Sequence, residues 1–141
     1  KPNTSPDMVM LHGSGSAAAL AWSSCAGSLA RNFTLYAPDL PAFGRSTLSW
    51  EVFRNASPSE IEDLYADFIA NYIDMMGLSK PVVVAHSIGG FFASKFAKKY
   101  PNRVSKLILV DSAGILPTLS NEGAYFALLF KLGIPTCQLR I

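Results

Sequence analysis

Short apolar runs alternate with longer amphipathic segments along the whole chain. Four apolar runs have the length of β-strands and fall at residues 8–11, 33–37, 81–85 and 106–110. Four segments with helical features lie between and after them, at residues 17–31, 58–76, 88–100 and 121–132. The third and fourth runs are apolar enough to predict buried strands. The alternation of strand and helix predicts an α/β fold, with a central parallel sheet covered by helices on both faces.

The clearest helix is the one predicted at residues 58–76. Ser57, Pro58 and Glu60 form a start signal in which Ser57 caps the first amides and Glu60 reaches back to Ser57. Apolar residues then recur at helical spacing from Ile61 to Met76. This regular stripe predicts a helix face packed in the core.

Composition narrows the classes of protein to which the chain can belong. Half of its residues are hydrophobic and only 16% are charged, against about a quarter in typical globular domains, which indicates a largely interior segment. A net charge of +2 gives no basis for binding nucleic acid. Cys25 and Cys137 lack the spacing of metal ligands, and no metal ion or cofactor is expected. No apolar stretch approaches the roughly 20 residues of a membrane span, and the start shows no secretory signal, which favours the cytoplasm.

Ser87 is the candidate nucleophile. It lies between a predicted strand and a predicted helix, with the small residues Ala85 and Gly89 two positions away on either side. Such a tight turn forces strained backbone angles on its central residue and leaves no room for larger neighbours. The hydroxyl would then stand at the carboxyl end of the sheet, where open α/β sheets bind their ligands.

Several spaced motifs together resemble the α/β-hydrolase superfamily over essentially all of the chain. The motifs are HGSG at residues 12–15, DLPAFGRS at 39–46, AHSIGG at 85–90 and the stretch 100–111. Ala85 and Ala42 replace glycines that are common in the family, and because alanine is still small we expect the turn at Ser87 to close. Asp39 is expected to hold the 39–46 loop.

The resemblance implies an oxyanion hole built from two backbone amides. One belongs to Ile88, at the positive end of the helix that follows the candidate nucleophile, and the other to Ser14. The rest of that loop consists of His12, Gly13 and Gly15. A serine rather than an aspartate at position 87 favours acyl transfer from an ester, thioester or amide, or hydrolysis of a carbon–carbon bond. The implied substrate is small and apolar, of the acyl type.

The chain offers no suitable base for this serine. Its two histidines are His12, expected to shape the oxyanion loop through hydrogen bonds, and His86, expected to be a packed structural residue whose ring points away from Ser87. The family places both acid and histidine after the serine. Asp111 follows the fourth strand, where some relatives place the acid, although a structural carboxylate that binds nearby amides is the favoured interpretation.

The resemblance also implies that the chain is the middle of a longer hydrolase. The four strands present would lie in the spatial order second, first, third, fourth. Residues 1–114 would form a partial core, and residues 115–141 the start of a cap over the acyl pocket. A helix lying on a membrane surface is the minority alternative for residues 121–132, which lack a basic face.

Three functions stay open at this point. The leading one is a serine hydrolase of the esterase or lipase kind, whose histidine base lies beyond residue 141. A non-catalytic or regulatory binding protein with the same fold would explain the missing base. An acyltransferase would use the same nucleophile and the same oxyanion hole. The oligomeric state stays open as well.

Overall fold

The structure is a computed structural model that describes residues 5–114. The helix predicted at 121–132 and the cap predicted at 115–141 lie outside these residues. Within the described part, no helix has both the length and the apolar character needed to cross a membrane.

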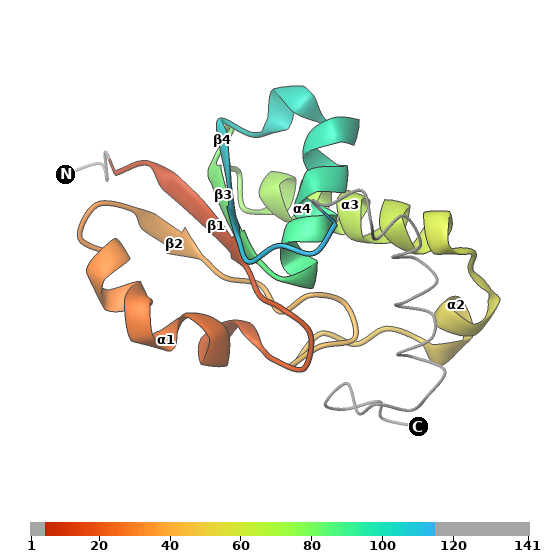
Figure 1. The fold of residues 1–141 in the computed structure, drawn as a ribbon. Coiled ribbons are helices and arrows are strands. Elements are labelled where there is room, and N and C mark those ends of the chain that lie inside the picture. Colours follow the sequence, from red (N-terminus) through yellow and green to blue (C-terminus); the bar gives the residue numbers. More distant parts are fainter. Residues whose placement is uncertain (1–4, 115–141) are drawn as a thin grey trace.

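The four predicted strands form one parallel sheet (Figure 1). They are β1 (Asp7–Leu11), β2 (Thr34–Tyr36), β3 (Val82–His86) and β4 (Lys106–Val110). The order β2-β1-β3-β4 is the spatial order predicted from the resemblance. Because every neighbouring pair is parallel, the carboxyl ends of all four strands meet at the same edge of the sheet.

The three helices predicted within the described residues are present, and two short elements are added to them. The predicted helices are α1 (Ala18–Leu29), α3 (Pro58–Met75) and α4 (Ile88–Lys99). The added elements are α2 (Trp50–Asn55) and the 3₁₀ turn η1 (Pro101–Arg103). The α2 helix was not predicted because its six residues are too few to show a helical period. Its start signal is Ser49, whose hydroxyl accepts a hydrogen bond from the Glu51 amide.

The start of α3 confirms the predicted capping box. The Ser57 hydroxyl accepts a hydrogen bond from the Glu60 amide, and the Glu60 carboxylate accepts one from the Ser57 amide at 2.7 Å. These two bonds satisfy amides that a helix start otherwise leaves without partners. The helix therefore begins where the sequence predicted.

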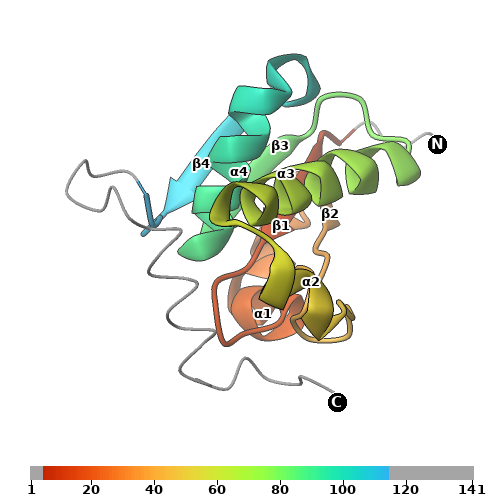
Figure 2. The ribbon, with the colours of Figure 1, turned by 90° about the vertical axis from the view of Figure 1, so that its right-hand side faces the viewer.

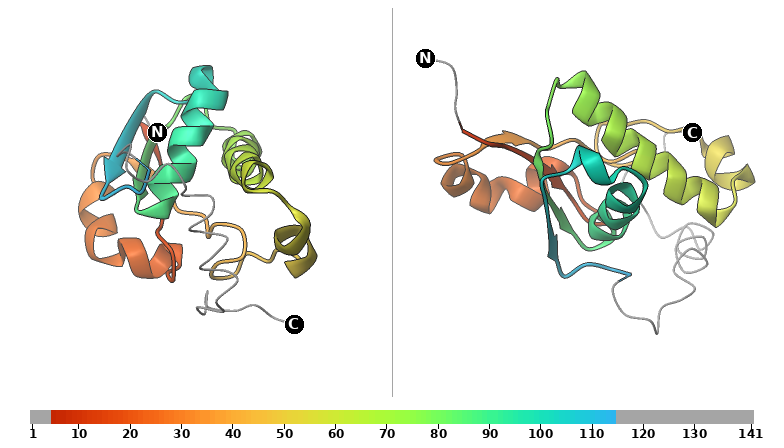
Figure 3. Two further views of the ribbon diagram at one scale, coloured as in Figure 1. Left: turned by 45° about the vertical axis from the view of Figure 1, so that its right-hand side comes forward. Right: turned by 90° about the horizontal axis from the view of Figure 1, so that it is seen from above.

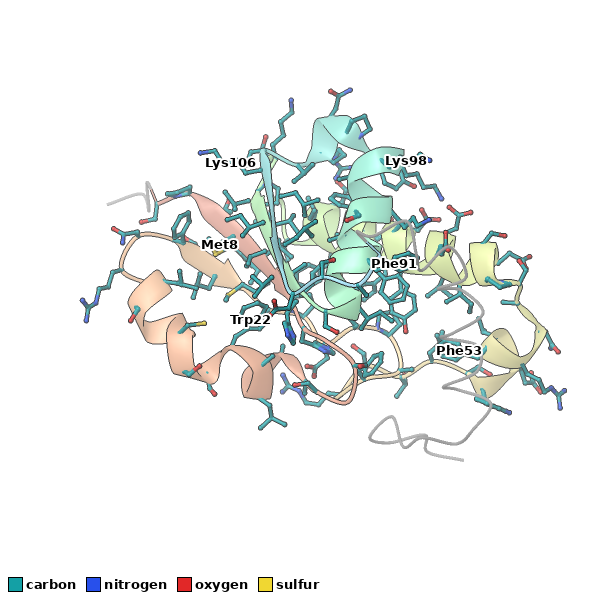
Figure 4. All side chains as sticks on the ribbon, viewed as in Figure 1. Met8, Trp22, Phe53, Phe91, Lys98 and Lys106 are labelled. Carbon is teal, nitrogen blue, oxygen red and sulfur yellow. The ribbon has the colours of Figure 1, made fainter. Side chains whose placement is uncertain are left out.

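Helices cover both faces of the sheet, as the alternation of elements predicted. Figure 3 shows α1 on one side and α3 with α4 on the other, and Figure 2 looks onto the face that α3 and α4 cover. Successive residues of β1 divide accordingly: Met8 packs in a cluster with Trp22 of α1, and Val9 packs in the main core with Phe91 and Phe92 of α4. Figure 4 shows Met8 and Trp22 on the side of the sheet opposite Phe91.

The prediction that β4 is a buried strand was wrong for the described part of the molecule. Ile108 is 44% exposed and Val110 is 39% exposed, whereas Leu107 and Leu109 are half-buried on the other face. The register pairs Val84 with Ile108, so Ile108 belongs to the α1 face, but α1 packs over the neighbouring strands instead. The spatial order implied by the resemblance placed this strand at the edge of the sheet, as observed among residues 5–114, whereas its apolar sequence alone suggested burial.

Candidate active site

Ser87 occupies the turn between β3 and α4 in a conformation that is rare for a side-chain-bearing residue. Its φ is 53° and its ψ is −124°, which confirms the strained backbone predicted from its small neighbours. The Ser87 amide donates to the carbonyl of Val110 at 3.1 Å. The Ser87 carbonyl accepts from the amides of Gly90 at 3.0 Å and Ala113 at 3.1 Å. Hydrogen bonds on both sides of the residue therefore hold this conformation.

The small residues around Ser87 allow the turn to close. A Cβ atom on Gly89 would lie 2.4 Å from the carbonyl oxygen of His12, so only glycine fits there. Ala85 is fully buried in the main core, which shows that an alanine is accommodated where the family often has glycine. The expectation that the turn closes in spite of Ala85 is confirmed.

The loop at residues 12–15 lies directly against Ser87. A Cβ atom on Gly13 would lie 3.0 Å from the Ser87 Cβ and 2.9 Å from His86 Nδ1, so the Gly13 backbone touches both residues. Ile88 is buried, and Ser14 is exposed at the surface. No hydrogen bond between residues 5 and 114 uses the amide of either one. The two amides named as oxyanion donors are thus without partners in the described part of the chain.

His12 is completely buried, and both of its ring nitrogens are in use. Nε2 accepts a hydrogen bond from the Leu40 amide at 3.0 Å, and Nδ1 lies 2.8 Å from the Gly13 carbonyl. Since Nε2 must accept, the proton of the neutral ring is on Nδ1, which donates to Gly13. Burial lowers the pKa of His12, although the Gly13 carbonyl and Asp39 act in the opposite sense. The residue shapes the loop, as expected, and joins it to the segment that follows β2.

Neither histidine contacts the Ser87 hydroxyl through a hydrogen bond among the described residues. His86 is half-buried, with its ring against Gly13. The source of the base for Ser87 stays a prediction.

Asp39 organises the loop at residues 39–46 and also reaches α1. Its carboxylate accepts from the amide of Arg45 at 2.9 Å and from the amide of Ala18 at 2.7 Å. Its carbonyl accepts from the Ser46 hydroxyl at 2.7 Å. Burial opposes the charged form, but the Arg45 and Ala18 amides together with the nearby His12 and Arg45 side chains outweigh it and lower the pKa of Asp39. The predicted loop-holding role is confirmed, and the bond to Ala18 is an addition that sequence spacing did not reveal.

Ala42, in the same loop, has the left-handed conformation that glycine prefers, with a φ of 66°. Its side chain is buried, at 7% exposure. The replacement of glycine by Ala42 therefore leaves a strained alanine in the loop. Gly44 follows with a φ of 54°, and a Cβ atom there would lie 2.4 Å from the Asp39 carboxylate carbon.

Asp111 directly follows β4 and is exposed, with a φ of 43°. No hydrogen bond or ion pair within residues 5–114 involves its carboxylate. The expectation that this carboxylate binds nearby amides thus finds no support in the described part of the molecule. Its alternative role as the acid of a catalytic triad stays a prediction.

A groove of about 500 Å³ opens between the loop that contains Pro41 and the middle of α3. Its apolar lining includes Leu48, Leu64 and Phe68. None of the predicted site residues lines it, so this groove and the surroundings of Ser87 are different places on the molecule. Residues 5–114 contain no cluster of three or more side chains that could hold a metal ion.

Comparison with known proteins places this arrangement in a family. The profile of the family described as alpha/beta hydrolase fold matches residues 6–131. The chain belongs to the α/β hydrolase fold family. Among solved members of this family, the chain is similar to 2-hydroxy-6-oxo-6-phenylhexa-2,4-dienoate hydrolase from Rhodococcus sp. strain RHA1. The TM-score is 0.71 and the identity 27%, over 91% of this chain and 46% of that one.

Curated α/β hydrolase relatives are more similar in sequence. Abhydrolase domain-containing protein abhd-5.2 of Caenorhabditis elegans is 43% identical over 107 residues, 76% of this chain and 23% of its own length. Human 1-acylglycerol-3-phosphate O-acyltransferase ABHD5 is 37% identical over 76% of this chain and 30% of its own length. Human (Lyso)-N-acylphosphatidylethanolamine lipase is 38% identical over 85% of this chain and 34% of its own length. The chain thus spans about a third or less of these relatives.

Proposed function

We propose that this chain is part of a serine hydrolase in which Ser87 attacks the carbonyl carbon of an acylated substrate. The observation that carries the proposal is the position of Ser87. A side-chain-bearing residue is held with a φ of 53° at the carboxyl end of β3, against the loop of Gly13. Such strain persists only where the surroundings enforce it, and it clusters at active sites.

In the proposed reaction, the Ser87 hydroxyl loses its proton to a base as its oxygen bonds to the carbonyl carbon. The carbonyl oxygen becomes an oxyanion, which the unpartnered amides of Ile88 and Ser14 would bind. Collapse of this intermediate expels the protonated leaving group and leaves an acyl ester on Ser87. Water then attacks the ester, the acid departs, and the serine regains its proton.

The base in this proposal comes from outside the 141 residues. His12 has both nitrogens engaged in hydrogen bonds, and the ring of His86 lies against Gly13. These are the two histidines in the sequence. The greater length of the relatives supports a further part of the protein that supplies the histidine and its acid, with Asp111 as an alternative acid.

The names of the relatives suggest which substrates to test first. One relative is named a (Lyso)-N-acylphosphatidylethanolamine lipase and another a 1-acylglycerol-3-phosphate O-acyltransferase. We therefore propose an apolar acyl chain carried on a phospholipid as the substrate class.

The decisive experiment is labelling of the full-length protein with a fluorophosphonate probe, which forms a covalent bond with activated serines. We expect stoichiometric labelling that Ser87→Ala abolishes. Ser24→Ala, which changes an exposed serine of α1, is the matched control and should label like the wild type. Labelling that survives Ser87→Ala would refute the assignment of the nucleophile. A folded wild type that does not label would favour the non-catalytic binding protein.

An acyltransferase is the second candidate, favoured by the similarity to the relative that bears that name. The two activities share the acyl ester on Ser87 and differ in the acceptor, which is water or a hydroxyl group. Incubation of a radiolabelled acyl phospholipid with and without 1-acylglycerol-3-phosphate separates them. Release of free fatty acid that is unaffected by the acceptor indicates a hydrolase, and transfer of label to the acceptor indicates an acyltransferase.

A further inference from the structure

The turn that follows β4 is bonded to the backbone of Ser87. The register pairs His86 with Val110, so the next residues, Ser87 and Asp111, leave neighbouring strands side by side. Both have a positive φ, 53° and 43°. The Val110 carbonyl accepts from the Ser87 amide, and the Ala113 amide donates to the Ser87 carbonyl, each at 3.1 Å. The last residue of β4 and the turn that follows it therefore together hold Ser87 through both of its peptide groups.

The same turn is packed against α4 without spare space. A Cβ atom on Gly90 would lie 2.2 Å from Ser112 Oγ, 2.7 Å from Ser112 Cβ and 3.3 Å from Ser112 Cα. Ser112 Oγ also donates to the Ala113 carbonyl at 2.9 Å, which fixes the rotamer of its short side chain. Since glycine is otherwise unfavourable inside a helix, its place in the first turn of α4 is explained by this contact.

We propose that residues 111–113 are a positioning element for Ser87, seated by the contact between Ser112 and Gly90. The proposal rests on the function proposed above for Ser87. These residues act through the Ser87 carbonyl, which accepts from the Ala113 amide, and the rare conformation of Ser87 needs such support from its surroundings. A displacement of Ser112 moves the Ala113 amide, and with it the direction of the serine hydroxyl.

The test, in the full-length protein, first adds a methyl group at the contact between Gly90 and Ser112 and then removes the Ser112 side chain. Gly90→Ala is expected to lower the fluorophosphonate labelling rate constant by about 10²-fold, because misplacement by about 1 Å has effects of this size. The loss should fall on the rate constant at saturating probe and leave the apparent affinity for the probe unchanged. Gly27→Ala in α1 is the matched control, since a Cβ there meets nothing within 4 Å, and it should label like the wild type.

Second substitutions at Ser112 separate positioning from a general loss of stability. Ser112→Gly removes both the hydroxyl and the Cβ, so adding it to Gly90→Ala should restore the rate to that of Ser112→Gly alone. Ser112→Ala keeps the Cβ at 2.7 Å and should restore little. If Gly90→Ala does not fold, the test is whether the double variant with Ser112→Gly folds and labels like Ser112→Gly alone; failure of that variant to fold would overturn the proposal. Equal rates in the two double variants, or an unchanged rate in Gly90→Ala, would overturn the proposal.

Amide hydrogen exchange gives a readout that does not depend on catalysis. In Gly90→Ala, the amides of Ser87 and Ala113 should exchange at least about tenfold faster, because local opening exposes them. The amides of α3 should be unchanged. If the wild type does not label but these two amides respond, the proposed function fails while the coupling of the turn to Ser87 stands. If neither amide responds, the positioning element is refuted whatever the activity.

Discussion

Ser87 and Ala42 share a positive φ, which is rare for a residue with a side chain, but they have it for different reasons. Ser87 has a φ of 53° at the end of β3, and Ala42 has a φ of 66° in the loop after β2. At position 87 the side chain supplies the hydroxyl that the proposed chemistry requires, so glycine could not replace it. At position 42 the side chain supplies a buried methyl group and no functional atom. The strain at Ser87 is thus explained by the proposed function, and the strain at Ala42 by nothing in the structure beyond tolerance of its methyl group.

The two sites also differ in what holds them. Ser87 is enclosed by backbone, with Gly89 against the carbonyl of His12 and with Ala113 bonded to its own carbonyl. Ala42 lies in a loop that the Asp39 carboxylate holds. This carboxylate accepts from the amide of Arg45 in the same loop and from the amide of Ala18 in α1. The backbone atoms that enclose Ser87 cannot rotate away, whereas the loop of Ala42 depends on the charge of the Asp39 carboxylate.

The largest effect is expected from Gly89→Ala, which removes the space that the turn at Ser87 needs. The added methyl would lie 2.4 Å from a backbone oxygen that cannot rotate away. Overpacking of this kind destabilises by about 3 kcal/mol, and alanine's helix preference recovers about 1 kcal/mol. Denaturant unfolding of the full-length protein measures the net loss. Gly27→Ala should instead stabilise, and equal behaviour of the two variants would contradict the close approach at Gly89.

A smaller effect is expected from Asp39→Asn, which weakens the support of the Ala42 loop. The amide side chain keeps one acceptor and loses the charge, so a loss of about 1.5 kcal/mol of unfolding free energy is expected at neutral pH. The pKa of Asp39 is lowered in the folded state. Its contribution is therefore complete above the ordinary carboxyl pKa and is lost as the pH falls below that value.

Unfolding free energies of wild type and Asp39→Asn, measured from neutral to acidic pH, should accordingly converge in acid. A difference between them that is independent of pH would show that the loop does not depend on the charge of Asp39.

The strain at Ser87 itself is measured by comparing two inactive variants. Ser87→Gly relieves the left-handed conformation, while Ser87→Ala keeps it, and neither has a hydroxyl. We expect the glycine variant to be the more stable by about 1 kcal/mol. Both should fail to label with fluorophosphonate. Equal stability would show that the turn does not strain a side-chain-bearing residue.

The smallest effect is expected from Ala42→Gly. Relief of the left-handed conformation contributes roughly 1–2 kcal/mol, and the lost burial of one methyl removes about 0.8 kcal/mol. We expect a net gain of about 0.5 kcal/mol in unfolding free energy, with labelling by fluorophosphonate unchanged. A marked loss of labelling would show that Ala42 does more than occupy the loop.

The sequence was most informative where neighbouring residues determine the outcome. The strained turn could be predicted from the small residues Ala85 and Gly89 on either side of Ser87, because that signal lies within a few residues. The bonds from Val110 and Ala113 that hold the turn could not be predicted in this way. The alternation of strands and helices predicted the parallel sheet, and the resemblance implied its order.

Contacts between distant residues could not be predicted in this way. The Asp39 carboxylate binds the Ala18 amide across 21 residues, and Ser112 packs on Gly90 although the rest of α4, η1 and β4 lie between them. The exposure of Ile108 depends on where α1 lies, which the composition of β4 does not encode. Such features follow from packing. When the partner of a side chain is a backbone amide, no particular residue type marks that partner in the sequence.

The hydrogen bonds of His12 have a consequence for how homologues of this chain can diverge. One imidazole joins the Gly13 carbonyl to the Leu40 amide, so two loops that are far apart in sequence share a single buried partner. A lineage that replaces this histidine must provide another buried acceptor for the Leu40 amide, because an unpaired buried amide is unfavourable. Substitutions at position 12 and in the segment around Leu40 should therefore be correlated among homologues, and the two loops would evolve as a unit.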